Sequence, residues 1–302
     1  MTITNHRRAR LASLLAVTML MLAASPAVAL ASAEPSCTPA FADAAGLRDS
    51  NGRLREPLAA QALTELPKSQ QHRGGAGFSE TVNVYFHVIS NGTEGSVSMG
   101  TLAQQMNVLG KGFAGQYGGA DTGFDYDLAG VDYTTNAAWF DAGPGSTAEA
   151  EMKQALKLGG PGDMNVYTTS GNAYLGWAYY PSIVGSAQEY LDGVVIDYRS
   201  LPGGPYGDAY SLGGTLTHEA GHWFGLGHTF DGGCGNKGDL VADTPAERTP
   251  TGGCPEGKDS CTAKPGLDPI HNYMDYSYDS CYTQFTPGQA TRAQDQFLAF
   301  RS

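Results

Sequence analysis

Residues 78–224, called the sheet half below, carry the hydrophobic patterns of alternating strands and helices. Residues 81–89 (TVNVYFHVI) alternate and are rich in β-branched and aromatic side chains, which is typical of a strand. Similar patterns predict strands at 124–133, 163–168 and 193–198 and an edge strand at 174–180. Helical spacing of the apolar positions predicts helices over 101–113, 147–158 and 211–224.

Residues 225–286, called the loop half below, have a different pattern. Gly, Pro, Asp and Cys dominate them, and a last helix is predicted over 286–300. No internal repeat is evident. We therefore expect an α/β (α+β) protein in which a sheet with helices precedes a loop-rich part that ends in a helix.

The first 33 residues predict a signal peptide. Three arginines precede an apolar stretch over 11–24, and two A-x-A sites follow at 27–29 and 31–33. The alternative is a membrane anchor, but the stretch is shorter than the roughly 20 residues that span a bilayer. We expect a secreted, extracellular protein without a membrane partner after cleavage.

Residues 34–76 differ from the chain that follows and are expected to be a propeptide, with the catalytic domain at 77–302. Residues 56–66 are weakly helical, and the polar run 69–75 is typical of an exposed linker. The alternative is a disordered extension without a role.

The charge is unevenly distributed. The net charge of the 302-residue chain is -12. Residues 1–33 carry three arginines and no acid, and the charges of residues 34–76 cancel, so the acidic excess belongs to residues 77–302. Such a body argues against nucleic acid and anionic membranes as partners. Hydrophobic residues at 41% exclude a disordered chain.

The strongest chemical signal is a run of three histidines near the end of the sheet half. His218 and His222 are four residues apart on a predicted helix, so both imidazoles can bind one metal ion. Glu219 lies beside them, near a metal-bound water. Gly225 can end the helix in a left-handed conformation and let the chain return His228 as a third ligand. Three histidines that share this spacing by chance are the alternative, and the spacing makes that rare.

The run is the H-E-x-x-H-x-x-G-x-x-H signature, and it resembles that of the metzincin metallopeptidases. The resemblance implies a Met-turn below the zinc, for which Met274 is the candidate, and Tyr276 occupies the place of a tyrosine that stabilises the oxyanion in several metzincins. Taken alone, a methionine is more often a core residue.

Within that clan the sequence resembles the pappalysin family, especially its cytophagalysin (ulilysin-like) secreted microbial members. The resemblance is dense over 193–300, looser over 78–190 and absent over 34–76. The shared features are GHWFGL (221–226), HTF (228–230), DTP (243–245), NYMDY (272–276) and FTPGQ (285–289), with Cys234 and Cys281. It implies a twisted mixed sheet that carries the active-site helix, followed by a loop-rich, disulfide-stapled subdomain.

The resemblance and the three histidines together imply a zinc endopeptidase acting on protein or peptide substrates. Zinc activates a water, Glu219 is its general base, and the strand at 174–180 is expected to pair with an extended substrate. An ordinary packed strand is the alternative for 174–180. Two further functions stay open: a non-catalytic zinc-containing binding or adhesion module, and a zinc amidase on a non-protein substrate. The sequence leaves the oligomeric state open.

Four of the five cysteines lie in the loop half and are expected to form two disulfides, because the chain is exported. Spacing alone cannot choose among the three pairings of Cys234, Cys254, Cys261 and Cys281. The family resemblance favours Cys234–Cys261 and Cys254–Cys281. Cys37 remains, and it is either a latency switch that binds the zinc or a free thiol in a mobile tail.

Two predicted binding sites in the loop half have open roles. Asp239, Asp243 and Thr244 lie in a Gly-rich loop whose oxygens suit calcium, as in some relatives, although Asp and Gly are also ordinary loop residues. If the resemblance holds, Asp279 lines the S1′ pocket, where a carboxylate favours Arg or Lys after the scissile bond. An ordinary solvated loop acid is the alternative.

Overall fold

A computed structural model describes residues 63–75, 77–235 and 238–302 of the protein. The predicted signal peptide at 1–33, the cysteine at position 37 and the first part of the expected propeptide lie outside the described residues. Residues 63–66 are not helical, so the helix predicted over 56–66 does not extend through its described end.

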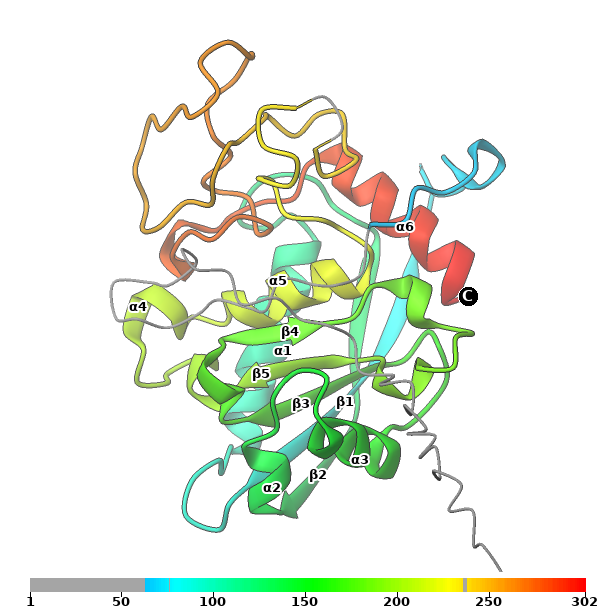
Figure 1. The fold of residues 1–302 in the computed structure, drawn as a ribbon, viewed down its shortest axis with the longest axis vertical. Helices are drawn as coiled ribbons and strands as arrows, with labels where there is room; N and C mark the ends of the chain where they lie inside the picture. Colours follow the sequence, from blue (N-terminus) through cyan, green and yellow to red (C-terminus); the bar gives the residue numbers. More distant parts are fainter. Residues whose placement is uncertain (1–62, 76, 236–237) are drawn as a thin grey trace, which may run out of the picture. The chain divides into compact units, whose positions relative to one another are not determined.

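The sheet has five strands in the order β2-β1-β3-β5-β4 (Figure 1). Four are parallel, and β4 pairs antiparallel with β5 at the edge. Their bounds are β1 Glu80–Ser90, β2 Phe124–Thr135, β3 Met164–Thr169, β4 Gly176–Ala178 and β5 Val194–Asp197. The mixed sheet confirms the predicted fold class, although the edge strand is shorter than the predicted 174–180.

The described part of the chain contains six α-helices. Their bounds are α1 Met99–Phe113, α2 Ala137–Phe140, α3 Thr147–Leu156, α4 Gly207–Tyr210, α5 Gly214–Trp223 and α6 Pro287–Phe300. Six 3-10 segments join them: η1 Lys68–Gln70, η2 Gly171–Ala173, η3 Pro181–Ile183, η4 Glu189–Leu191, η5 Tyr198–Ser200 and η6 Asp279–Cys281. Hydrophobic periodicity missed α2 and α4, because one turn is too short to show a period.

Alternate side chains of the central strands build two cores. Phe86, Val166 and Ile196 point to the face that α1, α5 and α6 cover. Tyr167 and Val195 point to the opposite face, where α2 and α3 pack. In Figure 1 these two pairs of helices, α1 with α5 and α2 with α3, lie on opposite sides of the sheet. The first core positions α5, the helix that carries two of the predicted metal ligands.

The loop half has almost no regular structure among its described residues. An isolated bridge joins Asn272 to Gln284, and two disulfides join Cys234 to Cys261 and Cys254 to Cys281. The pairing implied by the family resemblance is therefore confirmed. Among the described helices, none is both long and apolar enough to cross a bilayer.

Candidate active site

The three predicted metal ligands converge at the end of α5. His222 Nε2 lies 3.1 Å from Nε2 of His218 and 3.1 Å from Nε2 of His228. Two nitrogens of a tetrahedral zinc site are about 3.3 Å apart, since each Zn–N bond is about 2.0–2.1 Å. All three side chains are buried, so their donor atoms fit one zinc ion.

Backbone carbonyls orient two of these rings. Nδ1 of His218 lies 2.5 Å from the carbonyl oxygen of Tyr273, and Nδ1 of His222 lies 2.8 Å from that of Leu226. A carbonyl oxygen only accepts, so the hydrogen of each neutral ring is on Nδ1. The Nε2 lone pairs are therefore directed to the shared position, as a metal ligand requires.

A tight turn returns the chain from α5 to His228. Gly225 ends the helix at φ +89°, a left-handed conformation that glycine adopts without strain. The N–H of Leu226 then donates to the carbonyl of Gly221 at 2.9 Å. Asp231 fixes the third ligand, because its carboxylate accepts the N–H of His228 at 2.9 Å and lies 3.6 Å from Nδ1.

Met274 lies fully buried against α5. A Cβ atom at Gly221 would lie 2.3 Å from the sulfur of Met274, so glycine is required for this close approach. The carbonyl of Met274 accepts the N–H of Thr229 at 3.2 Å. This turn therefore connects the helix of the first two ligands with the segment of the third, at the place predicted for a Met-turn.

Glu219 lies in a pocket beside the three histidines. The side chain is buried and lies against the edge strand, because a Cβ atom at Gly176 would be 2.9 Å from Cγ and Oε1 of Glu219. The ring of Tyr276 is 5.7 Å from that of His218 and 5.1 Å from that of His228. The pocket is lined by Leu175, Thr215, His218, Glu219, Tyr276, Asp279 and Tyr282.

Asp279 lines the same pocket and also caps the N-terminus of α5. Its Oδ2 accepts the N–H groups of Leu212 at 2.9 Å and Gly214 at 3.0 Å. Asp279 thus caps the N-terminus of α5, where a carboxylate also interacts favourably with the helix dipole. The side chain is buried, which excludes the alternative of a solvated loop acid.

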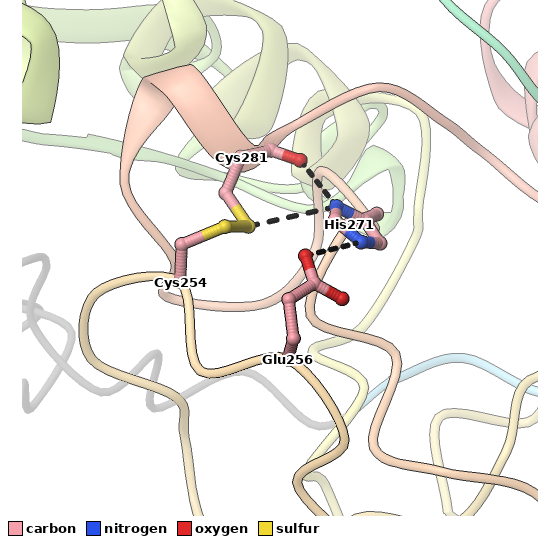
Figure 2. A group of neighbouring side chains, drawn as sticks. All are labelled: Cys254, Glu256, His271 and Cys281. Carbon is pink, nitrogen blue, oxygen red and sulfur yellow. Dashed lines mark hydrogen bonds and ion pairs between the residues drawn. A yellow bond between two sulfur atoms is a disulfide. The ribbon is translucent and has the colours of Figure 1, made fainter.

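A second cluster of potential ligands is occupied by a disulfide. Cys254, Glu256, His271 and Cys281 lie together, and Figure 2 shows the sulfurs of the two cysteines bonded to each other. His271 pairs with Glu256 at 3.3 Å and with the carbonyl of Cys281 at 2.7 Å. Because zinc needs thiolate sulfurs, this cluster is no zinc site in the oxidised protein.

The three residues predicted for calcium line one cavity in the loop half. Asp239 Oδ2 and Thr244 Oγ1 are both buried, and among the described residues their contact is with each other, where the Thr244 hydroxyl favours the ionised carboxylate of Asp239. Burial raises the pKa of Asp239 to about 6. The carboxylate of Asp243 instead accepts the Thr286 hydroxyl at 2.7 Å and the N–H of Gly288 at 2.8 Å, at the N-terminus of α6.

Comparison with known proteins identifies the family. The peptidase M43 family, described as pregnancy-associated plasma protein-A, matches residues 163–298. An extracellular metalloprotease of Sordaria macrospora is 47% identical over 228 residues, which cover 73% of this chain and 76% of that protein. The chain belongs to the pappalysin family of zinc metallopeptidases. Another extracellular metalloprotease, from Pyricularia oryzae, is 41% identical over 264 residues, covering 85% of this chain and 89% of that protein.

Solved structures agree with this assignment to the pappalysin family. Mature mirolysin of Tannerella forsythia, in complex with a cleaved peptide, has a TM-score of 0.62 and 26% identity, covering 72% of this chain and 92% of that one. A promirolysin mutant of the same organism has a TM-score of 0.65 and 26% identity, covering 76% and 84%. The predicted metzincin fold is confirmed.

The pattern of the sequence missed two residues of this pappalysin-family site. Asp231 holds His228, and Arg292 of α6 donates from Nε to the carbonyl of Gly225 at 2.8 Å. Asp231 follows His228 by three residues, a spacing that could have suggested the contact. Arg292 is distant in sequence, and no local pattern predicts it.

Proposed function

We propose that this metallopeptidase is a secreted endopeptidase that hydrolyses extracellular proteins, with Glu219 as its general base. The observation that carries the proposal is one pocket that joins Glu219 and Tyr276 to a metal ligand, His218, beside the edge strand. Zinc held by the three imidazoles supplies a Lewis acid that activates water and polarises the scissile carbonyl.

The residues around the zinc position have complementary tasks. The carboxylate of Glu219 accepts the proton of the attacking water and then delivers it to the leaving amine. The hydroxyl of Tyr276 donates a hydrogen bond to the oxyanion of the tetrahedral intermediate. Because the pocket walls are buried side chains, these charges interact in a medium less polar than water.

The edge strand supplies the substrate-binding surface. β4 pairs with β5 on one side only, and Gly176 in β4 lies against Glu219. An extended peptide can add to such an edge by main-chain hydrogen bonds. This arrangement favours a peptide substrate over a non-peptide amide, since an amide without an extended main chain would not use the edge.

Asp279 is proposed to set the preference for Arg or Lys after the scissile bond. Its carboxylate lines the pocket and caps α5, which keeps the charge fixed at the pocket wall. We expect peptides with Arg or Lys at this position to be cleaved faster than matched peptides with Leu. Equal cleavage of both sets, or no change of the ratio in Asp279→Asn, would contradict this preference.

The main test compares the activated protein with Glu219→Ala and with wild type treated with a chelator, using casein or gelatin. Both should lose activity, the variant by roughly 10²–10⁴-fold, because general base catalysis contributes about that much. Glu219→Ala should still bind zinc. Inactive wild type with bound zinc would favour the binding module, and activity only on non-protein amides would favour the amidase.

The zymogen is part of the same proposal. A signal peptide at 1–33 directs export, and a propeptide from residue 34 onward keeps the enzyme latent through a Cys37 thiolate at the zinc. The acidic body at 77–302 supports protein substrates rather than nucleic acid. Cys37→Ala should raise the activity of the uncleaved chain, and an equally inactive variant would exclude the switch.

Calcium is proposed to bind in the cavity of Asp239, Asp243 and Thr244, and two observations support this. The buried oxygens Oδ2 of Asp239 and Oγ1 of Thr244 lie near each other and have no other hydrogen-bonded partner among the described residues, and the Asp239 carboxylate is ionised above about pH 6. Calcium should raise the midpoint of thermal unfolding at pH 7.5, and the effect should shrink below pH 6 and vanish in Asp239→Asn. Asp208→Asn, on the short helix α4, is the matched control.

A further inference from the structure

A segment of the expected propeptide is built into the catalytic domain. Residues 63–75, called the strap below, run beside α6, as the blue segment in Figure 1 shows, and they precede β1. Leu66 of the strap is buried with 6% of its surface exposed. The expected boundary at residue 76 would remove the whole strap on activation.

The downstream end of the strap is held by its main chain. Asp295 of α6 accepts the backbone N–H groups of His72 at 2.6 Å, Arg73 at 2.7 Å and Gly74 at 3.2 Å. The side-chain oxygen of Gln294 accepts the N–H of Gly75 at 2.7 Å. Hydrogen bonds to a carboxylate are roughly twice as strong as those between neutral groups, so this end of the strap is anchored firmly.

The upstream end of the strap reaches the zinc-binding turn. The carbonyl of Thr64 accepts Nη2 of Arg292 at 3.0 Å and Nε2 of Gln296 at 2.9 Å. The same guanidinium donates from Nε to the carbonyl of Gly225, which lies between the second and third ligands. Arg292 therefore bridges the strap and the turn, as the planar fork of guanidinium donors allows.

The strap also covers that turn directly. A Cβ atom at Gly227 would lie 2.5 Å from Cδ1 of Leu63 and 2.9 Å from Oδ2 of Asp231. Leu63 and Asp231 thus both lie against Gly227, the residue next to His228. Removing the strap would expose the turn and leave one end of Arg292 without its partner.

We propose that the strap remains in the active enzyme, that maturation cleaves upstream of Leu63, and that Arg292 is a positioning residue for the zinc-binding turn. The inference rests on the proposed function only in that the turn holds zinc. Partners outside the ligand shell hold ligands in place, and their loss costs about 10–100-fold in metal affinity. The strap and Arg292 act in this way through the backbone of Gly225 and Gly227.

The first test determines the N-terminus of active protein purified from culture, by intact mass and N-terminal sequencing. The inference requires a first residue at or before Leu63. Fully active protein that begins after Leu63, for example at Gly77, would overturn it.

The second test measures the rate at which a chelator removes zinc from Arg292→Met, with the thermal midpoint of the metal-free protein as the measure of folding. Zinc release should accelerate by about 10–100-fold, with partial rescue in Arg292→Lys. Arg248→Met is the control, because Arg248 bonds Ser260 in the loop half and should leave the rate unchanged. Equal rates in wild type and Arg292→Met would refute the positioning role.

Asp295→Asn serves if Arg292→Met does not fold, since it keeps the shape and removes the charge that holds the strap. Asp295→Asn should increase both the rate of trypsin cleavage at Arg73 and the rate of zinc release. Faster cleavage without faster zinc release would also refute the positioning role of the strap. A wild-type protein that binds no zinc would instead refute the proposed function, so the two failures are distinguishable.

Discussion

The sheet half and the loop half are stabilised by different means. In the sheet half, strand side chains such as Phe86 and Val195 are fully buried in two apolar cores. The loop half adds a few apolar side chains, such as Met274 and Phe285, to the first of these cores. Two disulfides and partly buried charges cross-link the rest of it, and Lys258 lies 2.8 Å from Glu247 and 3.0 Å from Asp268. A chain without regular elements can bury little apolar surface and needs such cross-links.

The active site takes its parts from both halves. His218 and Glu219 lie on α5 in the sheet half, whereas His228, Met274 and Tyr276 belong to the loop half. The helix gives the first ligands a rigid base, and the loop half completes the site. Damage to the sheet half should therefore unfold the whole domain, and damage to the loop half should disturb the site first.

The largest effect is expected from Phe86→Ala. Its side chain is fully buried in the core between the sheet and α5, so the free energy of unfolding should fall by about 3–5 kcal/mol. Urea unfolding followed by circular dichroism measures this. Tyr133→Ala on β2 is the control, since that ring is 57% exposed, and should change stability by at most about 0.5 kcal/mol. Equal losses in both variants would contradict the conclusion that the buried core supplies most of the stability of the sheet half.

The next effect is the loss of one disulfide, in a Cys254→Ser and Cys281→Ser double variant. Removing a native disulfide from a small domain lowers the free energy of unfolding by about 2–5 kcal/mol. The loss should be smaller here, because the core of the sheet half also stabilises the domain. Hydrogen exchange should increase mainly over 249–285 and little over 80–90. A uniform increase across both ranges would show that the two halves unfold as one unit.

A smaller effect should appear in the pH dependence of the loop half. Burial, aided by the nearby charge of Asp275, raises the pKa of Glu247 from 4.5 to about 7. Protons are then bound more tightly in the folded state, so the contribution of Glu247 to stability is present below pH 4.5 and is lost as pH rises towards 7. The loss should be at most about 1.4 kcal/mol per pH unit.

Glu247→Gln should flatten this pH dependence between pH 5 and 7 in urea unfolding of the zinc-loaded protein. Glu247 accepts the hydroxyl of Thr229 at 2.8 Å, and glutamine keeps an oxygen for that bond. An unchanged slope would assign the pH dependence to another group.

The smallest effect is expected at the surface of the loop half. His271 and Glu256 pair at 3.3 Å, but 73% of the Glu256 side chain is exposed, so water screens the pair (Figure 2). Glu256→Gln should change the free energy of unfolding by less than about 0.5 kcal/mol. A larger loss in thermal unfolding would show that the pair supports the neighbouring disulfide.

Prediction from sequence succeeded where a local period or spacing carries the information. The strand at 81–89 and the helices before and after the loop half show their periods directly, and the H-E-x-x-H spacing depends only on helix geometry. The edge strand shrank to Gly176–Ala178, because Pro181 begins the 3-10 segment η3 soon after it. The helix predicted from 211 begins at Gly214, because Gly213 adopts φ +94°.

The sequence by itself determined the ligand set, since His218 and His222 share a helix face and Gly225 permits the turn to His228. Only the tertiary structure decided what holds that set in place. Asp279 caps α5 from 65 residues away, and Arg292 reaches Gly225 from 67 residues away. Contacts between distant residues leave no period in the sequence, because they depend on how the sheet half and the loop half pack together.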